Sequence, residues 1–171
     1  LVVKHPRYQQ GAADDVDLAL IRFKVPLSSP RPISLNTVKN ELNKVVTIVG
    51  WGYFGIGTLG RQYADGRMRY ATNRISQSGR YLRFKFDDPR EIVSASLPTE
   101  GMLGLGDSGG PALVETAAGV RLAGVAVGQL VNAIYDEETQ GRYGAIAIYE
   151  RVSSHLQWIE SVINCEGCII E

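Results

Sequence analysis

Residues 104–113 are the part of this sequence best suited to nucleophilic chemistry. They read Gly-Leu-Gly-Asp-Ser-Gly-Gly-Pro-Ala-Leu, so that Ser108 lies between an aspartate and two glycines. Glycine tolerates backbone conformations that a Cβ atom disfavours, which permits a tight turn around the serine. Such a turn presents a hydroxyl nucleophile and aims backbone N–H donors at one point, as acyl transfer requires. A Gly-rich surface turn is the alternative, but the whole run 106–111 favours the nucleophile.

Residues 106–110 also fit Gly-x-Ser-x-Gly, the nucleophile elbow of α/β-hydrolases. That elbow joins a strand to a helix, whereas Ser108 is followed by a proline and a strand-like segment. In α/β-hydrolases the acid and the histidine also follow the serine. Here the nearest later acid in a loop is Asp136, and His155 lies in a predicted helix. The esterase interpretation is therefore disfavoured.

The composition argues against several other classes of function. The chain has 18 basic and 18 acidic residues, and this balance provides no electrostatic attraction to nucleic acid or to an anionic membrane. The longest apolar run, residues 45–56, is too short to span a bilayer and is interrupted by glycines. The only cysteines are Cys165 and Cys168, which we expect to pair with each other or with another segment.

Short strands separated by turns are predicted along most of the chain. Residues 45–49 are β-branched and continuous, as in a buried strand, and residues 81–86 alternate apolar with basic side chains. Many short strands with turn residues between them are typical of an all-β barrel or sandwich. Further strands are predicted at residues 1–3, 18–23, 69–75, 112–115, 120–127 and 143–149.

Three other segments are predicted to be a connector, a loop and a helix. The proline-containing residues 26–43 predict an extended connector, and the Gly-rich residues 55–66 predict a loop. A helix is predicted near the C-terminus because apolar residues recur at helical spacing from 152 to 163. Ser154 and Gln157 fit a capping box at its start.

Four segments occur in this order along the chain: Asp17-Leu-Ala-Leu20, Gly50-Trp-Gly52, Gly106-Asp-Ser-Gly-Gly-Pro111 and Tyr149-Glu-Arg-Val-Ser-Ser-His-Leu-Gln-Trp-Ile159. Together they resemble the chymotrypsin/trypsin-like serine protease family. This family implies an all-β fold of two packed antiparallel β-barrels, with the active site between them and a C-terminal helix against the second barrel. We therefore expect residues 1–36 to form the end of a partial first barrel and the connector. Residues 37–150 would form the second barrel, and residues 151–171 the C-terminal helix and the Cys-containing tail.

The resemblance implies a role for each matching residue. Ser108 would be the catalytic nucleophile, and Asp17 would be the acid that orients the catalytic histidine. The backbone N–H groups of Gly106 and Ser108 would form the oxyanion hole. Asp107 would form an ion pair with a newly cut N-terminal ammonium group. Without the resemblance, Asp17 reads as one of several acids in a turn.

The family's catalytic histidine has no counterpart in this sequence. It lies in an Ala-Ala-His-Cys-like segment before the acid, whereas His5 here lies in a His-Pro turn and His155 in the predicted helix. The Ile-Val-Gly-Gly-like N-terminus that would pair with Asp107 has no counterpart either. We therefore expect the chain to be the longer fragment of a protease, with an N-terminal companion chain that carries the histidine.

The preference for a substrate side chain is predicted from the pocket wall. Met102 falls where trypsin has an aspartate, and Leu103 follows it. An apolar pocket is expected to favour aliphatic or aromatic side chains at the cleavage site over Lys or Arg. A loop shift of one or two residues would instead bring the carboxylate of Glu100 into the pocket and reverse this preference.

The strand that would pair with the substrate backbone comprises residues 125–129. It carries Val127, Gly128 and Gln129 where the family usually has Ser-Trp-Gly. Val127 removes a hydroxyl that normally supports the triad acid, so the environment of Asp17 is expected to differ. The disulfides that brace the second barrel of animal enzymes are absent from the sequence, which favours a bacterial or otherwise divergent member.

The sequence therefore predicts a serine endopeptidase that hydrolyses polypeptides through an acyl-enzyme on Ser108, without a metal or an organic cofactor. By resemblance alone, the location is expected to be secreted or periplasmic. The alternative is a catalytically inactive, protease-like binding module. Such homologues usually lose the serine or the histidine, so the presence of Ser108 and Asp17 opposes this alternative.

Overall fold

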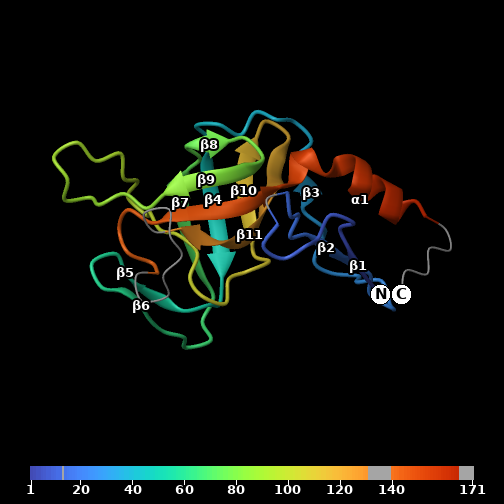
Figure 1. Ribbon diagram of the computed structural model, residues 1–171, viewed down its shortest axis with the longest axis horizontal. Coiled ribbons are helices and arrows are strands. Elements are labelled where there is room, and N and C mark those ends of the chain that lie inside the picture. The colour runs from blue at the N-terminus through green and yellow to red at the C-terminus, as the bar shows by residue number, and fades with distance from the viewer. Residues whose placement is uncertain (13, 131–139, 166–171) are drawn as a thin grey trace.

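The computed structural model describes residues 1–12, 14–130 and 140–165, and strands dominate it (Figure 1). The strands form one large sheet of eight strands and two sheets of two strands. The first half of the chain contains β1 (Val2–Lys4), β2 (Ala19–Ile21), β3 (Ser34–Leu35), β4 (Val45–Gly50), β5 (Phe54–Ile56), β6 (Gly60–Tyr63), β7 (Arg69–Arg74) and β8 (Gln77–Ser78). The second half contains β9 (Tyr81–Lys85), β10 (Pro111–Thr116), β11 (Gly119–Leu130), β12 (Ile146–Arg151), a short 3₁₀ helix η2 (Val152–Ser154) and α1 (Leu156–Ile163).

The large sheet is a curled, antiparallel half-barrel. Its strand order is β7-β4-β10-β11-β12-β9-β8, and β3 adds to β11 in parallel. Side-chain hydrogen bonds connect the region of β7 back to that of β9, because Asn73 Nδ2 donates to the carbonyls of Lys85 and Gly101, both at 3.0 Å. This architecture confirms the predicted all-β fold class with a C-terminal helix.

The core lies inside the curl of the large sheet. Strand residues two positions apart face the same side, so the alternating pattern of β4 and β9 directs one set of side chains inward. Val46 of β4 and Leu82 and Phe84 of β9 are fully buried there. The same cluster includes Ile48, Ile75, Leu103, Ala112, Val114, Ala123, Ala126, Ala147 and Tyr149.

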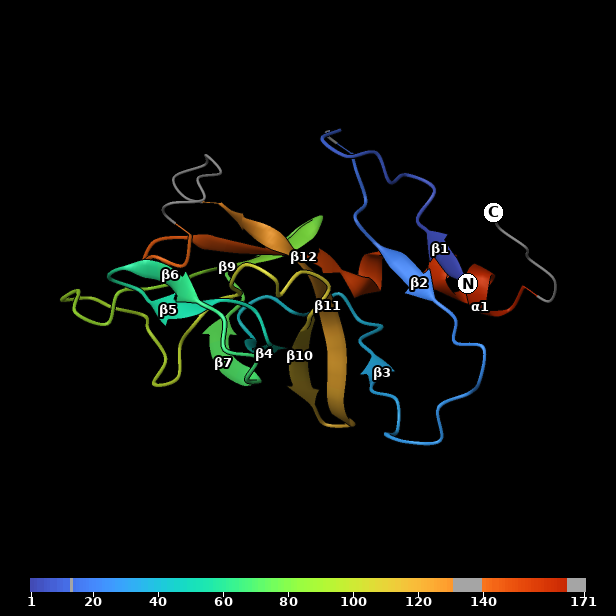
Figure 2. The same cartoon turned by 90° about the horizontal axis from the view of Figure 1, so that it is seen from below.

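The hairpin-like sheet of β1 and β2 lies beside α1 in both views (Figures 1 and 2). The ring of His5 packs edge-on against Trp158 of α1, with the ring centroids 4.7 Å apart. Two strands alone are marginally stable, so this contact helps to hold the N-terminal sheet. The other side of this region is open to solvent, since Ile21, Phe23 and Val25 are 62–74% exposed.

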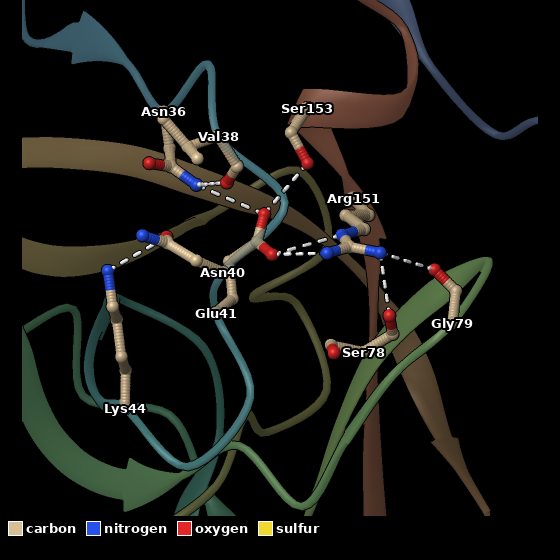
Figure 3. Close-up of polar contacts among 9 residues, drawn as sticks. All are labelled: Asn36, Val38, Asn40, Glu41, Lys44, Ser78, Gly79, Arg151 and Ser153. Carbon is tan, nitrogen blue, oxygen red and sulfur yellow. Dashed lines mark hydrogen bonds and ion pairs between the residues drawn. The ribbon is translucent and has the colours of Figure 1, made fainter.

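A buried carboxylate anchors the connector to the end of β12 (Figure 3). Glu41 is completely buried and accepts hydrogen bonds from Asn36 Nδ2 at 3.0 Å, Ser153 Oγ at 2.7 Å and the guanidinium of Arg151. Burial alone would raise the pKa of Glu41, but the hydrogen bonds from Arg151 and Ser153 outweigh it and lower the pKa. This ion pair fixes the connector relative to the C-terminal helix.

Two local predictions were wrong. Ser154 does not cap the helix, because residues 152–154 already turn as η2 and His155 takes the N-cap position without a side-chain cap hydrogen bond. Residues 55–66 are not simply a loop, because β5 and β6 pair within this region. The rings of Phe54 and Tyr63 pack across the hairpin at 4.4 Å, which stabilises the pairing.

The remaining predicted strands are present with shifted ends. The largest differences concern β11, which continues to Leu130, and β12, which begins at Ile146 rather than at Tyr143. Within the described part of the chain, no helix has the length and apolar character needed to cross a membrane.

Candidate active site

Ser108 is exposed and lies in a turn just before β10. Gly106 and Gly109 have φ values of +91° and +80°, which glycine adopts far more readily than other residues. The N–H of Gly109 donates to the carbonyl of Ala126 at 2.8 Å, so β11 holds the turn in place. The two glycines thus permit the turn and a strand hydrogen bond fixes it.

Two backbone donors next to Ser108 are available. In the described parts of the chain, neither the N–H of Gly106 nor that of Ser108 donates to an acceptor, and the Ser108 hydroxyl has no hydrogen-bond partner. Backbone N–H groups that flank an exposed hydroxyl can stabilise negative charge on a nearby oxygen. The turn therefore combines an exposed hydroxyl with two backbone donors that have no acceptor among the described residues.

The carboxylate of Asp107 is held inside this turn. Its Oδ1 accepts a hydrogen bond from the N–H of Gly52 and its Oδ2 one from the N–H of Gly104, both at 2.7 Å. Gly50 makes room for it, since a Cβ there would lie 1.9 Å from Oδ1. Burial, together with the charge of Asp107, raises the pKa of the Tyr149 hydroxyl. The Gly50-Trp-Gly52 segment thus holds the Asp107 side chain, through the space at Gly50 and the N–H of Gly52.

A cavity of about 230 Å³ opens beside Asp107. Met102 lines it and packs partly against the core, and Leu103 lines it but is only 4% exposed because it belongs to the core. Gln129 also lines it, and its Oε1 accepts a hydrogen bond from the N–H of Gly141 at 2.9 Å. The wall near Met102 is therefore apolar, and the Gln129 side chain is tied to a neighbouring loop.

Val127 and Gly128 lie on β11 at an irregularity in its pairing with β12. The register shifts between Ala126 and Gly128, which leaves Val127 without a partner in the ladder. A Cβ at Gly128 would contact no heavy atom within 4 Å. This part of β11 is therefore open on the side of Gly128.

Glu100 lines the same cavity, but both of its carboxylate oxygens are occupied. Oε1 accepts a hydrogen bond from the N–H of Asp87 at 2.6 Å, and Oε2 accepts one from the N–H of Leu97 at 2.7 Å. These bonds close the base of the loop between the two residues. Both carboxylate oxygens of Glu100 are therefore engaged in hydrogen bonds within residues 87–100.

Asp17 is exposed, and its backbone is attached to a buried glutamate. The N–H of Asp17 donates to Glu150 Oε1 at 3.1 Å, while its own carboxylate makes no hydrogen bond to the described residues. Burial, followed by the charges of Asp15 and Glu150, raises the pKa of Asp17. Glu150 in turn belongs to β12, which pairs with the strand that holds the Ser108 turn.

The two histidines are buried near Asp17 and are engaged with other groups. His155 Nε2 lies 3.1 Å from Glu150 Oε2, and His5 Nδ1 accepts a hydrogen bond from the N–H of Arg7 at 3.2 Å. Burial, and then the charges of His155 and Arg7, lower the pKa of His5. The sequence did not indicate this cluster, because alternation along β12 would place Glu150 towards solvent, opposite the buried Tyr149.

The described residues include no group of three or more His, Cys, Asp or Glu side chains arranged to bind a metal ion. Cys165 is disulfide-bonded. Cys168 and Asp136 lie outside the described residues.

Several known proteins resemble this chain in sequence or in fold. The family model described as Trypsin matches residues 1–159. The chain is 27% identical to phenoloxidase-activating factor 3 of Holotrichia diomphalia, over 95% of this chain and 46% of that protein. It is also 27% identical to vitamin K-dependent protein C of Mus musculus, over 97% of this chain and 36% of that protein. The chain thus spans less than half the length of these curated relatives.

A solved structure has the same fold. Neuropsin, a serine protease expressed in the limbic system of mouse brain, matches with a TM-score of 0.71 at 15% sequence identity. The match covers 96% of this chain and 70% of neuropsin. At this identity the likeness concerns the fold alone.

Proposed function

Since this chain belongs to the trypsin family of serine proteases, we propose that it is an endopeptidase with Ser108 as its nucleophile. The observation that carries this proposal is the exposed turn of Ser108. There the hydroxyl lies beside two backbone N–H groups that have no acceptor among the described residues. Acyl transfer needs this combination of a nucleophile and donors for a developing oxyanion.

In the proposed reaction, a histidine imidazole accepts the proton of Ser108 Oγ as this oxygen attacks the peptide carbonyl. The oxyanion that forms accepts hydrogen bonds from the N–H groups of Gly106 and Ser108, and each donor contributes about 3 kcal/mol to the transition state. The amine product leaves with the proton from the histidine, and water then hydrolyses the ester on Ser108. Asp17 orients the imidazole and stabilises its protonated form.

The imidazole would come from polypeptide outside these 171 residues. His155 and His5 are only 6% and 7% exposed, and His155 is bound to Glu150. The exposed apolar side chains Ile21 and Phe23 provide a surface that a companion segment of the first barrel would cover. Residues 1–36 would then complete that barrel, residues 37–150 would be the second barrel, and residues 151–171 the helix and tail.

The proposed substrate has an apolar side chain at the cleavage site. Met102 and Leu103 contribute apolar lining to the cavity, and Gln129 marks the strand that would pair with the substrate. The alternative of a basic preference through Glu100 loses support, because two backbone N–H groups already occupy its carboxylate.

Asp107 would gain a further partner in an N-terminal ammonium group upon activation. A secreted or periplasmic location is part of the proposal, and the disulfide-bonded Cys165 fits an oxidising compartment.

The proposal is tested with the purified chain together with any polypeptide that accompanies it. A fluorophosphonate probe should label the wild type on Ser108 and leave Ser108→Ala unlabelled. Peptides with Leu or Phe at the cleavage site should be cleaved faster than the same peptides with Lys. Intact mass under denaturing conditions should reveal a second polypeptide that contains a histidine. If such an assembly is present but neither labels nor cleaves, the chain is an inactive binding module instead.

A further inference from the structure

Asp17 is held by a hydrogen bond from its backbone N–H, and not by a hydrogen bond to its carboxylate. β11 carries Val127 at the position expected to supply a supporting hydroxyl, so no hydroxyl is available there. The only hydrogen bond to a side chain that fixes Asp17 among the described residues is the one from its N–H to Glu150 Oε1, at 3.1 Å. The position of Asp17 therefore depends on where Glu150 is held.

Glu150 is held on two sides. It is 1% exposed, and its backbone pairs with Tyr81 of β9 and Val125 of β11 in the ladder of the large sheet. Its Oε2 lies 3.1 Å from Nε2 of His155, whose side chain is 6% exposed. A buried carboxylate is costly unless both oxygens are hydrogen-bonded, and this one uses Oε1 for Asp17 and Oε2 for His155.

His155 is itself fixed by aromatic packing. The ring of His5 lies edge-on to it at 5.2 Å and edge-on to Trp158 at 4.7 Å. The N–H of His5 donates to the carbonyl of Leu18, next to Asp17, at 2.8 Å. The N-terminal region thus contacts α1 through His5 and β12 through Asp17, and the hydrogen bond from His5 to Leu18 brings these two contacts together in space.

We propose that Glu150 and His155 are positioning residues for the catalytic acid, with Glu150 fixing the backbone of Asp17 and His155 fixing the carboxylate of Glu150. This inference rests on the proposed function, in which Asp17 is the acid of a Ser-His-Asp triad. Glu150 then takes over part of the support that a hydroxyl at position 127 would have given. It does so from β12 and not from β11.

The charge of Glu150 has a second effect on catalysis. A negative charge near the triad favours the imidazolium that forms in the transition state, so it raises the pKa of the catalytic histidine. Removing this charge lowers that pKa, and the acidic limb of kcat/KM moves to lower pH. The other titratable groups around Glu150 and Asp17 are Asp15, Tyr81, His5 and His155; Arg80 contacts Asp15 and Tyr81, and Arg7 lies beside His5.

Two substitutions of Glu150 in the assembled protease separate these effects. Glu150→Leu removes the acceptor for the Asp17 N–H, and kcat should fall about tenfold with KM unchanged, as expected for the loss of one hydrogen bond. Glu150→Gln keeps an acceptor oxygen, so kcat should stay within about twofold of the wild type while the acidic limb moves to lower pH. The matched control is Glu41→Gln, which alters a buried glutamate that does not contact Asp17.

The control should lower thermal stability but leave kcat and the pH profile as in the wild type. Asp17→Asn separates failure of this inference from failure of the proposed function, since loss of the triad acid lowers kcat on the order of 10⁴-fold. If Asp17→Asn is inactive but Glu150→Leu keeps the kcat and pH profile of Glu41→Gln, the positioning role of Glu150 is wrong and the proposed protease function is retained. If Glu150→Leu does not fold, an unshifted acidic limb in Glu150→Gln overturns the inference. An unaffected Asp17→Asn overturns the proposed function itself.

Discussion

Replacing Glu41 by glutamine should strongly lower the stability of the folded protein, because Glu41 is the acceptor at the centre of a buried hydrogen-bond network. The carboxylate is completely buried and accepts hydrogen bonds from Asn36, Ser153 and Arg151 (Figure 3). In the variant, an NH₂ group replaces one oxygen and at least one of these donors loses its acceptor. The positive charge of Arg151 then stays buried without its counterion.

The magnitude follows from this geometry. Breaking a buried ion pair by removing one partner costs about 3–5 kcal/mol. Arg151 retains hydrogen bonds to the carbonyls of Ser78 at 2.6 Å and Gly79 at 3.1 Å, which places the expected loss near the lower end. For a domain of this size, a loss of about 3 kcal/mol lowers the midpoint of thermal unfolding by roughly 6–12 °C.

The assay is thermal unfolding followed by circular dichroism at several pH values. The network lowers the pKa of Glu41 below its ordinary value of 4.5, so the stability that it contributes is present above that value. This contribution is lost as the pH falls through the lowered pKa of the folded state. The difference in the midpoint of thermal unfolding between the wild type and Glu41→Gln should therefore become smaller at acidic pH. Glu91→Gln, at an exposed position, should match the wild type at every pH.

Two results would refute this reasoning. The first is a midpoint for Glu41→Gln within about 2 °C of the wild type, because the ion pair would then contribute little. The second is a difference between the two proteins that does not depend on pH below 4.5. A double variant, Glu41→Met with Arg151→Met, should recover part of the loss, because it removes both buried charges.

Three further predictions concern the site and its surroundings. Gly50→Ala places a methyl group 1.9 Å from Oδ1 of Asp107, so the carboxylate must move and fluorophosphonate labelling of Ser108 should slow at least about tenfold. Met102→Asp should raise the ratio of kcat/KM for Lys over Leu peptides at least about tenfold, because it puts a charge into an apolar wall. Burial lowers the pKa of His5, so the folded state resists its protonation and loses stability as the pH falls below 6.5. Urea unfolding at about pH 7 and pH 5 should show a smaller loss for His5→Gln than for the wild type.

Local patterns in the sequence were sufficient to predict the longer strands of the large sheet, but not the two-residue strands β3 and β8. The alternation of residues 81–86 and the β-branched run 45–49 correspond to β9 and β4, because one face of each strand is buried in the core. The Gly50-Trp-Gly52 segment was recognised only through its resemblance to the family. Its physical reason, the space for the carboxylate of Asp107, depends on a contact between segments far apart in the chain.

Buried charges could not be predicted in this way. Glu41 and Glu150 are acidic residues, which are usually exposed, and the resemblance to the family assigned neither of them a role. Their burial depends on partners distant in the sequence, such as Arg151 for Glu41 and the Asp17 N–H for Glu150. The predicted start of the helix was wrong for a related reason. The side chain of His155 contacts the carboxylate of Glu150, and residues 152–154 form a 3₁₀ turn before the helix begins.

The end of β12 contacts the parts of the molecule that would together position the proposed triad. Glu150 and Arg151 are neighbours on this strand and so point to opposite sides, Glu150 to Asp17 and Arg151 to Glu41 of the connector. Val125, opposite Glu150, is followed on β11 by Ala126, whose carbonyl holds the Ser108 turn through Gly109. The path from the proposed acid to the proposed nucleophile therefore runs through one pair of strands and a few polar contacts. Because the N-terminal sheet has only two short strands among the described residues, we expect the buried charge of Glu150, and not apolar packing alone, to fix Asp17 relative to Ser108.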